Sequence, residues 1–226
     1  MFIGKSVTNE GWGGLMEDTK GLTVPAYSIT SPVSAADTST SPTAIKEETP
    51  SLADKGIYII SESFTPVLAK NVITWILEAN LNPNRTFTHL TLIINSPGGQ
   101  VPSAFAIIDA MKGSALPVHT IGLGQISSCG LLTFLAGAKG HRVLTPNTAI
   151  LSHQWAWASW GKEHELFAAV KEFGLTTKRI MDHYKACTGL TEDVIRARLL
   201  PAEDIWLSPE EALELNICDQ VRTMGA

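Results

Sequence analysis

From Gly56 onward, short runs rich in β-branched residues alternate with segments that carry apolar residues at helical spacing. This alternation is typical of βα units, in which helices connect parallel strands and pack on the sheet. Strands are expected at residues 56–61, 90–95, 118–123, 142–144, 149–152 and 217–221. The sequence therefore predicts an α/β fold with a largely parallel sheet.

The intervening segments differ in how much of their surface is apolar. Residues 66–79 have one apolar face, whereas residues 101–111 and 127–138 are apolar nearly all round and should form interior helices. Residues 162–187 form the longest amphipathic pattern, about 39 Å as a helix, and should project to meet another subunit. A further helix should begin at Ser208, which is followed by Pro209 and by Glu211 in capping-box spacing.

Composition favours one core preceded by a tail. The 226 residues fit a single domain, with 44% hydrophobic residues and only 17% charged residues, which hints at subunit interfaces. Residues 30–50 are rich in Ser, Thr, Pro and Ala, so they cannot bury enough surface to offset their ordering entropy. We expect a flexible N-terminal region at residues 1–54 and a compact domain at residues 55–226.

Charge and cysteine content argue against several classes of protein. The net charge is −5 without a basic cluster, which gives nucleic acid binding little support. Cys129, Cys187 and Cys218 form no CxxC pair, as expected in a reducing compartment. No apolar run is long enough to span a membrane, and no targeting signal is evident. The sequence predicts a cytoplasmic protein.

Two glycine- or serine-containing turns between a strand and a helix could carry chemistry. Gly98 and Gly99 allow a sharp turn with free N–H groups, although an ordinary structural turn is the simpler interpretation. In the turn at residues 124–130, Ser127 or Ser128 could be a nucleophile beside N–H groups that stabilise an oxyanion. Taken alone, either serine is more often a helix cap.

A base and a carboxylate could complete a serine-based site. His153 lies at the end of an apolar strand, where it could act as a general base. The other five histidines lack the spacing of metal ligands. The candidate carboxylates are Asp204, Asp182, Asp193, Glu203 and Asp219. Spacing alone does not choose among them, because a triad is defined by spatial geometry.

Six motifs occur in an order that is highly specific as a set. They are INSPGG at 94–99, GQISSCG at 124–130, AGAKGHR at 136–142, LTPN at 144–147, ILSHQ at 150–154 and DIWLSPEEALELNICD at 204–219. Together they resemble the ClpP family, the proteolytic subunits of ATP-dependent Clp proteases. The resemblance implies a ClpP/crotonase-like α/β fold of repeated β-β-α units with a protruding handle helix at residues 162–187.

The resemblance also implies a site and a reaction. It identifies Ser128 as the nucleophile, His153 as the general base and Asp204 as the orienting carboxylate of a serine endopeptidase. The backbone N–H groups of Gly99 and Cys129 would form the oxyanion hole. The reaction would be acyl transfer followed by hydrolysis, with no metal or organic cofactor in this chain.

Partners follow from the same resemblance. Family members form heptameric rings that stack into a tetradecamer, and an ATP-using AAA+ unfoldase feeds polypeptides into the chamber for protein quality control. The unfoldase docking cleft is atypical here, because Thr91, Ile93, Gly113 and Val143 occupy positions that are usually aromatic. Glu203 replaces an arginine that usually engages the opposite ring.

Three other functions remain open at this point. A capsid-maturation protease of phage type would explain the unusual N-terminus, and a non-catalytic accessory ring subunit would explain the altered cleft. A crotonase-type acyl-CoA enzyme shares the fold but does not explain His153 and Asp204 beside Ser128. Trp155 and Trp157 should share one face of an extended segment, either in a substrate groove or, as we favour from sequence, in subunit packing.

Overall fold

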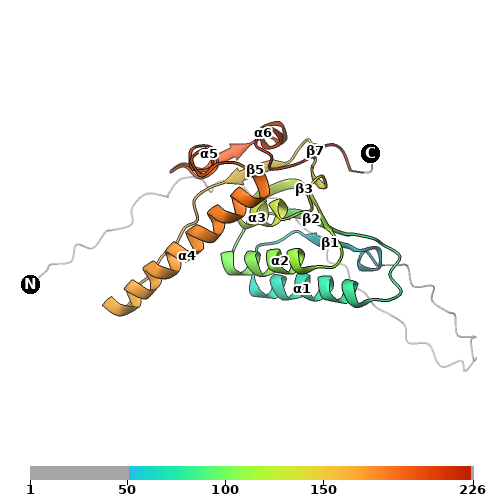
Figure 1. The fold of residues 1–226 in the computed structure, drawn as a ribbon, viewed down its shortest axis with the longest axis horizontal. Helices are drawn as coiled ribbons and strands as arrows, with labels where there is room; N and C mark the ends of the chain where they lie inside the picture. Colours follow the sequence, from blue (N-terminus) through green and yellow to red (C-terminus); the bar gives the residue numbers. More distant parts are fainter. Residues whose placement is uncertain (1–50, 225–226) are drawn as a thin grey trace, which may run out of the picture. The chain divides into compact units, whose positions relative to one another are not determined.

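The computed structural model describes residues 51–224 (Figure 1). The predicted flexible region at residues 1–54 therefore lies almost entirely outside the described residues. The first described element is a short 3-10 helix at Ala53–Lys55, which ends at Gly56 in a left-handed conformation. The β1 strand follows at once, close to the start predicted for the compact domain.

The elements alternate along the chain much as the sequence predicts. The strands are β1 (Ile57–Ile60), β2 (Leu90–Ser96), β3 (Val118–Ser127), β4 (Arg142–Leu144), β5 (Ala149–Ser152), β6 (Ile205–Leu207) and β7 (Gln220–Val221). The α-helices are α1 (Pro66–Leu81), α2 (Val101–Gly113), α3 (Cys129–Leu135), α4 (Glu163–Thr188), α5 (Glu192–Arg198) and α6 (Pro209–Glu214). The chain is thus a mixed α/β protein.

The sheet is parallel except at one end and branches along β3. Its main path runs β1-β2-β3-β4-β7, and every pairing on that path is parallel. The first half of β3 pairs with β4, whereas residues 125–127 pair with β5. The β6 strand then pairs antiparallel to β5. This branch brings the carboxyl ends of β3 and β5 close to the beginning of β6.

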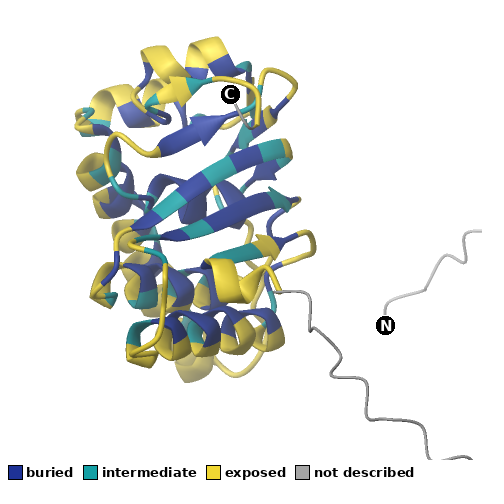
Figure 2. Ribbon diagram, turned by 90° about the vertical axis from the view of Figure 1, so that its right-hand side faces the viewer, coloured by how far each residue is buried: buried dark blue, intermediate teal, exposed yellow. Residues whose placement is uncertain are grey.

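Helices α1, α2 and α3 pack with the sheet around one apolar core (Figure 2). Leu90, Leu92 and Ile94 alternate along β2 and are fully buried in that core. Alternation along a strand places them on one face of the sheet, because successive side chains point to opposite sides. The α1 helix begins at Pro66, and its N-cap is Thr65, whose hydroxyl accepts a hydrogen bond from the Leu68 N–H.

The α4 helix packs against the core through its second half only. Ile180, Met181 and Tyr184 are buried, whereas Phe167 and Val170 in its first half are exposed. Figure 1 shows this first half extending away from the sheet. The helix is therefore the protruding element that the sequence predicts, and it presents unpaired apolar side chains.

The strand that leads to Ser128 is longer than predicted. The sequence indicates a strand at 118–123 followed by a turn, but β3 continues to Ser127. Gly124 has φ +65°, and the pairing with β2 shifts register between Ile94 and Ser96. The shift in register accommodates the positive φ of Gly124 without ending the strand, as a β-bulge does. Consequently α3 begins at Cys129 rather than at the predicted residue 127.

Apart from the short 3-10 helix, one α-helix and one strand were missed altogether. The α5 helix and the three-residue strand β6 occupy a stretch that shows no clear pattern in the sequence.

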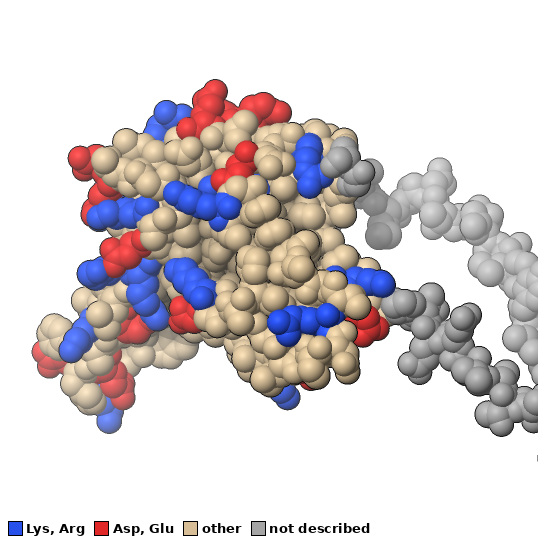
Figure 3. Space-filling view, turned by 45° about the vertical axis from the view of Figure 1, so that its right-hand side comes forward, with Lys and Arg blue, Asp and Glu red and all other residues tan. Residues whose placement is uncertain are grey.

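On the face shown in Figure 3, basic and acidic side chains are interspersed between broad uncharged areas. Among residues 51–224, no helix is both long and apolar enough to cross a membrane.

Candidate active site

Ser128 stands at the sharp turn between β3 and α3. Its backbone has φ 54° and ψ −118°, a conformation that is costly for a residue with a Cβ. The Ser128 N–H donates to the Leu151 carbonyl at 3.0 Å, so pairing with β5 holds the turn in place. Ser128 occupies the N-cap position of α3, yet its side chain caps no backbone N–H. The usual capping role of a serine therefore does not apply.

The two adjacent serines differ in their surroundings. Ser127 is fully buried, and its hydroxyl accepts a hydrogen bond from the Gln125 side-chain amide at 2.8 Å. Ser128 is half-buried and lines a small cavity that also contains His153. Only Ser128 is therefore placed where a ligand could reach its oxygen.

The loop that contains Gly98 and Gly99 packs directly against this turn. Gly98 has φ +103°, and a Cβ added there would lie 2.7 Å from the Ser128 Cβ. The loop is fixed on its other side, because the Phe64 N–H donates to the Gly98 carbonyl at 2.8 Å. The Cys129 thiol donates to the Gly99 carbonyl at 3.1 Å, and burial raises the pKa of this thiol to about 11, which keeps it protonated. The two turns are thus held together.

Two backbone donors remain unused where these turns meet. Among the described residues, neither the Gly99 N–H nor the Cys129 N–H has a hydrogen-bond acceptor. Cys129 follows Ser128 directly, and Gly99 follows Gly98, where an added Cβ would lie 2.7 Å from the Ser128 Cβ. Free N–H groups beside a nucleophile can stabilise the negative oxygen of a tetrahedral intermediate.

His153 follows β5, and Asp204 precedes β6, the strand that pairs with β5. The His153 Nδ1 atom lies 3.9 Å from the Asp204 Oδ1 atom, longer than a hydrogen bond but close enough for an ion pair when the imidazole is protonated. The Asp204 side chain is 66% exposed. Apo sites often hold such pairs loosely and tighten when substrate binds.

The other candidate carboxylates are not paired with this histidine. Asp219 forms an ion pair with Arg142, with 2.6 Å between Oδ1 and Nη2, and Asp182 pairs with Lys178. Asp193 and Glu203 make no ion pair among the described residues. Of the five carboxylates considered from sequence, Asp204 is the one that the fold places beside His153.

A buried hydroxyl network positions the end of β5. Ser152 is fully buried, and its hydroxyl donates to the Leu199 carbonyl at 2.6 Å. It accepts from the Tyr184 hydroxyl at 2.8 Å, and burial raises the pKa of Tyr184 to about 12, so this donor stays protonated. The network ties the residue before His153 to α4 and to the segment that leads to Asp204. Sequence reasoning missed it, because a serine and a tyrosine 32 residues apart carry no shared pattern.

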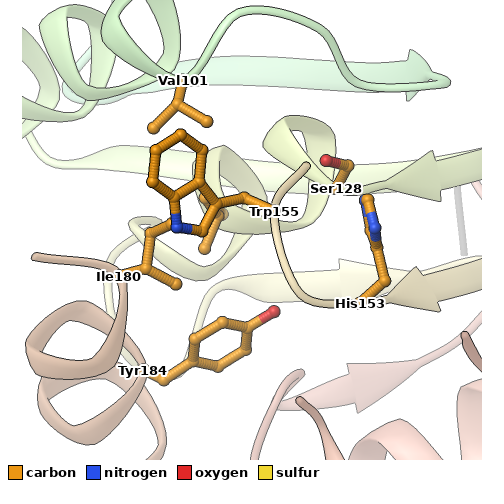
Figure 4. A pocket seen from close by; sticks show the side chains of 7 residues that line it. Val101, Ser128, His153, Trp155, Ile180 and Tyr184 are labelled. Carbon is orange, nitrogen blue, oxygen red and sulfur yellow. The ribbon is translucent and has the colours of Figure 1, made fainter. Parts of the chain in front are cut away.

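The cavity beside Ser128 is very small. It measures about 10 Å³, room for roughly one water molecule. Its lining residues are Val101, Ser128, Leu132, His153, Trp155, Ile180 and Tyr184. Figure 4 shows the Trp155 indole between Val101 and Ile180, with Ser128 and His153 on the other side. Trp155 therefore packs within its own chain, beside the site, rather than only at a subunit surface.

The described residues contain no group of three or more His, Cys, Asp or Glu side chains suited to a metal ion. Three histidines with no shared sequence spacing do come together: the His119 ring stacks on His89 and on His141, with centroids 4.1 and 3.9 Å apart. Burial, followed by these two neighbours, lowers the pKa of His119 to about 4. The stack lies at the start of β2, β3 and β4, away from Ser128.

A half-buried serine on a strained turn, a histidine that lines the same cavity, a carboxylate next to the histidine and two free N–H groups can together carry out acyl transfer. The fold and this arrangement place the chain among candidate hydrolases built on a parallel sheet. Comparison of the sequence with known protein families identifies which class of hydrolase this is. The family model described as Clp protease matches residues 43–224, and the chain belongs to that family.

Two named relatives agree with this assignment. The ATP-dependent Clp protease proteolytic subunit 1 of Chlamydia abortus (strain DSM 27085 / S26/3) is 33% identical over 165 residues, which cover 71% of this chain and 83% of that protein. The protein of the same name from Chlamydia muridarum (strain MoPn / Nigg) is 32% identical over 174 residues, covering 75% and 88% respectively. The chain is therefore a ClpP-type peptidase. These relatives do not favour the capsid-maturation, accessory-subunit or acyl-CoA alternatives.

Proposed function

We propose that this chain is a serine endopeptidase in which Ser128, His153 and Asp204 form the catalytic triad, within a peptidase domain at residues 55–226. The observation that carries the proposal is that Ser128 and His153 line one cavity while Asp204 lies 3.9 Å from His153. His153 accepts the Ser128 proton as the hydroxyl attacks a peptide carbonyl. Asp204 orients the imidazole and stabilises its protonated form.

The oxyanion hole consists of the Gly99 and Cys129 N–H groups. The negative oxygen of the tetrahedral intermediate accepts hydrogen bonds from both, and His153 then returns its proton to the leaving amine. Water hydrolyses the acyl-enzyme by the same steps, with His153 again as base. This scheme uses no metal or organic cofactor in the chain.

The chain also forms part of a larger assembly under this proposal. Seven copies form a ring, and two rings stack through α4, whose first half carries exposed apolar side chains. An ATPase ring supplies unfolded polypeptides, in keeping with the names of the relatives. Thr91, Ile93, Gly113 and Val143 in the expected docking cleft are not aromatic, so an ATPase would dock weakly, or another partner would take its place.

The test is labelling with a fluorophosphonate probe, read together with the mass of the assembly by size-exclusion chromatography. Wild type and Ser127→Ala are expected to label, and Ser128→Ala is expected not to label while keeping the same assembly mass. Equal labelling of Ser128→Ala would exclude Ser128 as the nucleophile. A large assembly of wild-type chains that does not label would contradict the proposed peptidase function.

A further inference from the structure

The cavity beside Ser128 bears on which peptides can be cleaved. The carbonyl that a serine attacks belongs to the residue called P1. The P1 side chain is bonded to the Cα atom, which is itself bonded to the attacked carbonyl carbon. A P1 side chain must therefore lie within a few ångströms of the Ser128 oxygen once the carbonyl is in place. The space on that side is the cavity lined by Val101, Trp155 and Ile180.

This space is filled by a side chain of the protein itself. The Trp155 indole lies across the cavity and leaves about 10 Å³. A second, larger cavity of about 250 Å³ lies on the other side of Trp155, and Trp155 and Ile180 line both. The indole is thus a wall between a nearly filled pocket next to Ser128 and an apolar space beyond it.

Contacts with α4 hold the Trp155 indole in this position. The Trp155 ring stacks on Phe173, with centroids 4.7 Å apart and planes 23° apart. Its Nε1–H donates to the Thr177 hydroxyl at 3.1 Å. Moving the indole out of the pocket would break this hydrogen bond and the stacking contact together, so the closed arrangement is favoured.

We propose that Trp155 is a specificity-determining residue that restricts P1 to glycine, alanine and other side chains of similar size. The inference rests on the proposed function, because it concerns the peptide that Ser128 attacks. A methyl group can occupy the residual space, whereas the branched four-carbon side chain of leucine would have to displace the indole. Overfilling a packed apolar pocket is costly.

The experiment compares two fluorogenic peptides that differ only in alanine or leucine at P1. For the assembled wild-type protein, kcat/KM should be at least about 100-fold higher for the alanine peptide. In Trp155→Ala the two cavities merge, and the ratio should shift by at least about tenfold toward leucine. Trp157→Ala is the matched control. The Trp157 ring also packs near Phe173, with ring centroids 5.6 Å apart, but Trp157 lines neither cavity. Its ratio should equal that of wild type.

A second variant guards against misfolding of Trp155→Ala. Trp155→Phe keeps an aromatic ring against Phe173 and should shift the ratio in the same direction by a smaller factor. Equal cleavage of both peptides by wild type, or an unchanged ratio in both Trp155 variants, would overturn the inference. Fluorophosphonate labelling of the same samples separates the two claims. Labelled protein without P1 discrimination refutes the role of Trp155 alone, whereas wild type that neither labels nor cleaves refutes the proposed function as well.

Discussion

Ser128 and the loop around Gly98 are held in backbone conformations that most residues avoid. Ser128 has a positive φ, and Gly98 has φ +103° against the Ser128 side chain. At Ser128 such strain costs about 1–3 kcal/mol and persists only where the surroundings impose it, whereas Gly98 adopts its positive φ without this cost. The strand pairing of Ser128 with Leu151 and the hydrogen bond from Phe64 to Gly98 supply that constraint.

Gly98→Ala should therefore impair catalysis more than folding. The new methyl group would lie 2.7 Å from the Ser128 Cβ and 2.9 Å from the Ser127 carbonyl oxygen, so the loop or the nucleophile must move. We expect kcat/KM to fall at least about 100-fold, as displacements near 1 Å at a reacting centre do. Peptidase assays and the rate of fluorophosphonate labelling measure the effect.

Gly113→Ala is the matched control for that substitution. No atom lies within 4 Å of a Cβ added at Gly113, and it stands at the end of α2. Its activity should equal that of wild type. Normal labelling of Gly98→Ala would show that the contact between Gly98 and Ser128 does not position the nucleophile.

At the scale of elements, residue patterns predict the long α4 helix and the positions of four strands well, whereas the strand expected at residues 217–221 is present only at Gln220–Val221. They fail where a pattern is too short or is interrupted. Three residues of β6 cannot show alternation, and Gly124 reads as a turn although pairing with β2 and β5 carries the strand past it. Residue patterns left two serines and five carboxylates open, and the resemblance to the ClpP family singled out Ser128, His153 and Asp204. Only the fold shows that Trp155 lies beside Ser128 and His153.

The contact between α3 and α4 should make stability depend on pH. His183 is buried on α4, and its Nε2–H donates to the Leu132 carbonyl at 2.8 Å. Burial lowers the pKa of His183 to about 4, although this hydrogen bond opposes the shift. Its unfolded value is about 6.5, so the unfolded state takes up the proton first as pH falls. Stability should be full above pH 6.5 and decrease down to about pH 4.

His183→Gln tests this expectation, because glutamine keeps a donor without titrating. The unfolding free energy from urea denaturation at pH 7.5 and pH 5, at one protein concentration, should fall less for His183→Gln than for wild type. The unfolding free energy of His183→Gln should still depend on pH to some extent, because the pKa of His119 is also lowered to about 4. Identical losses in wild type and His183→Gln would rule out a contribution from His183.

For the whole molecule, one buried ion pair joins distant parts of the chain. Arg142 is 2% exposed, and its Nε and Nη2 atoms donate to Asp219 at 3.0 and 2.6 Å. Its Nη1 atom donates to the Cys187 carbonyl near the end of α4 at 3.1 Å. The guanidinium thus connects β4 with the segment before β7 and with α4.

Asp219→Ala should destabilise the fold by about 3 kcal/mol, because it leaves a buried guanidinium without its carboxylate. Glu192→Gln, which removes the exposed partner of Arg196, should change the unfolding free energy far less. Burial alone would raise the pKa of Asp219, but the hydrogen bonds and charge of Arg142 lower it below its ordinary value. The stabilisation of the fold by ionised Asp219 is therefore fully present above about pH 4, and it is lost as the pH falls through the lower pKa of the folded state. Chemical denaturation at pH 7 and pH 3 measures both effects, and a small loss in Asp219→Ala at pH 7 would contradict them.

The branching of the sheet along β3 divides the molecule into parts that can open separately. The β2 and β4 strands pair with the first part of β3, apart from one pairing of Ser96 with Ile126, and β1 pairs with β2. The β5 strand pairs only with the last three residues of β3, and β6 pairs with β5. The β5–β6 pair carries His153 and Asp204, so local unfolding there would dismantle the base and its carboxylate while the larger sheet stays intact. Global stability and the fraction of chains competent for turnover are consequently two separate properties of this fold.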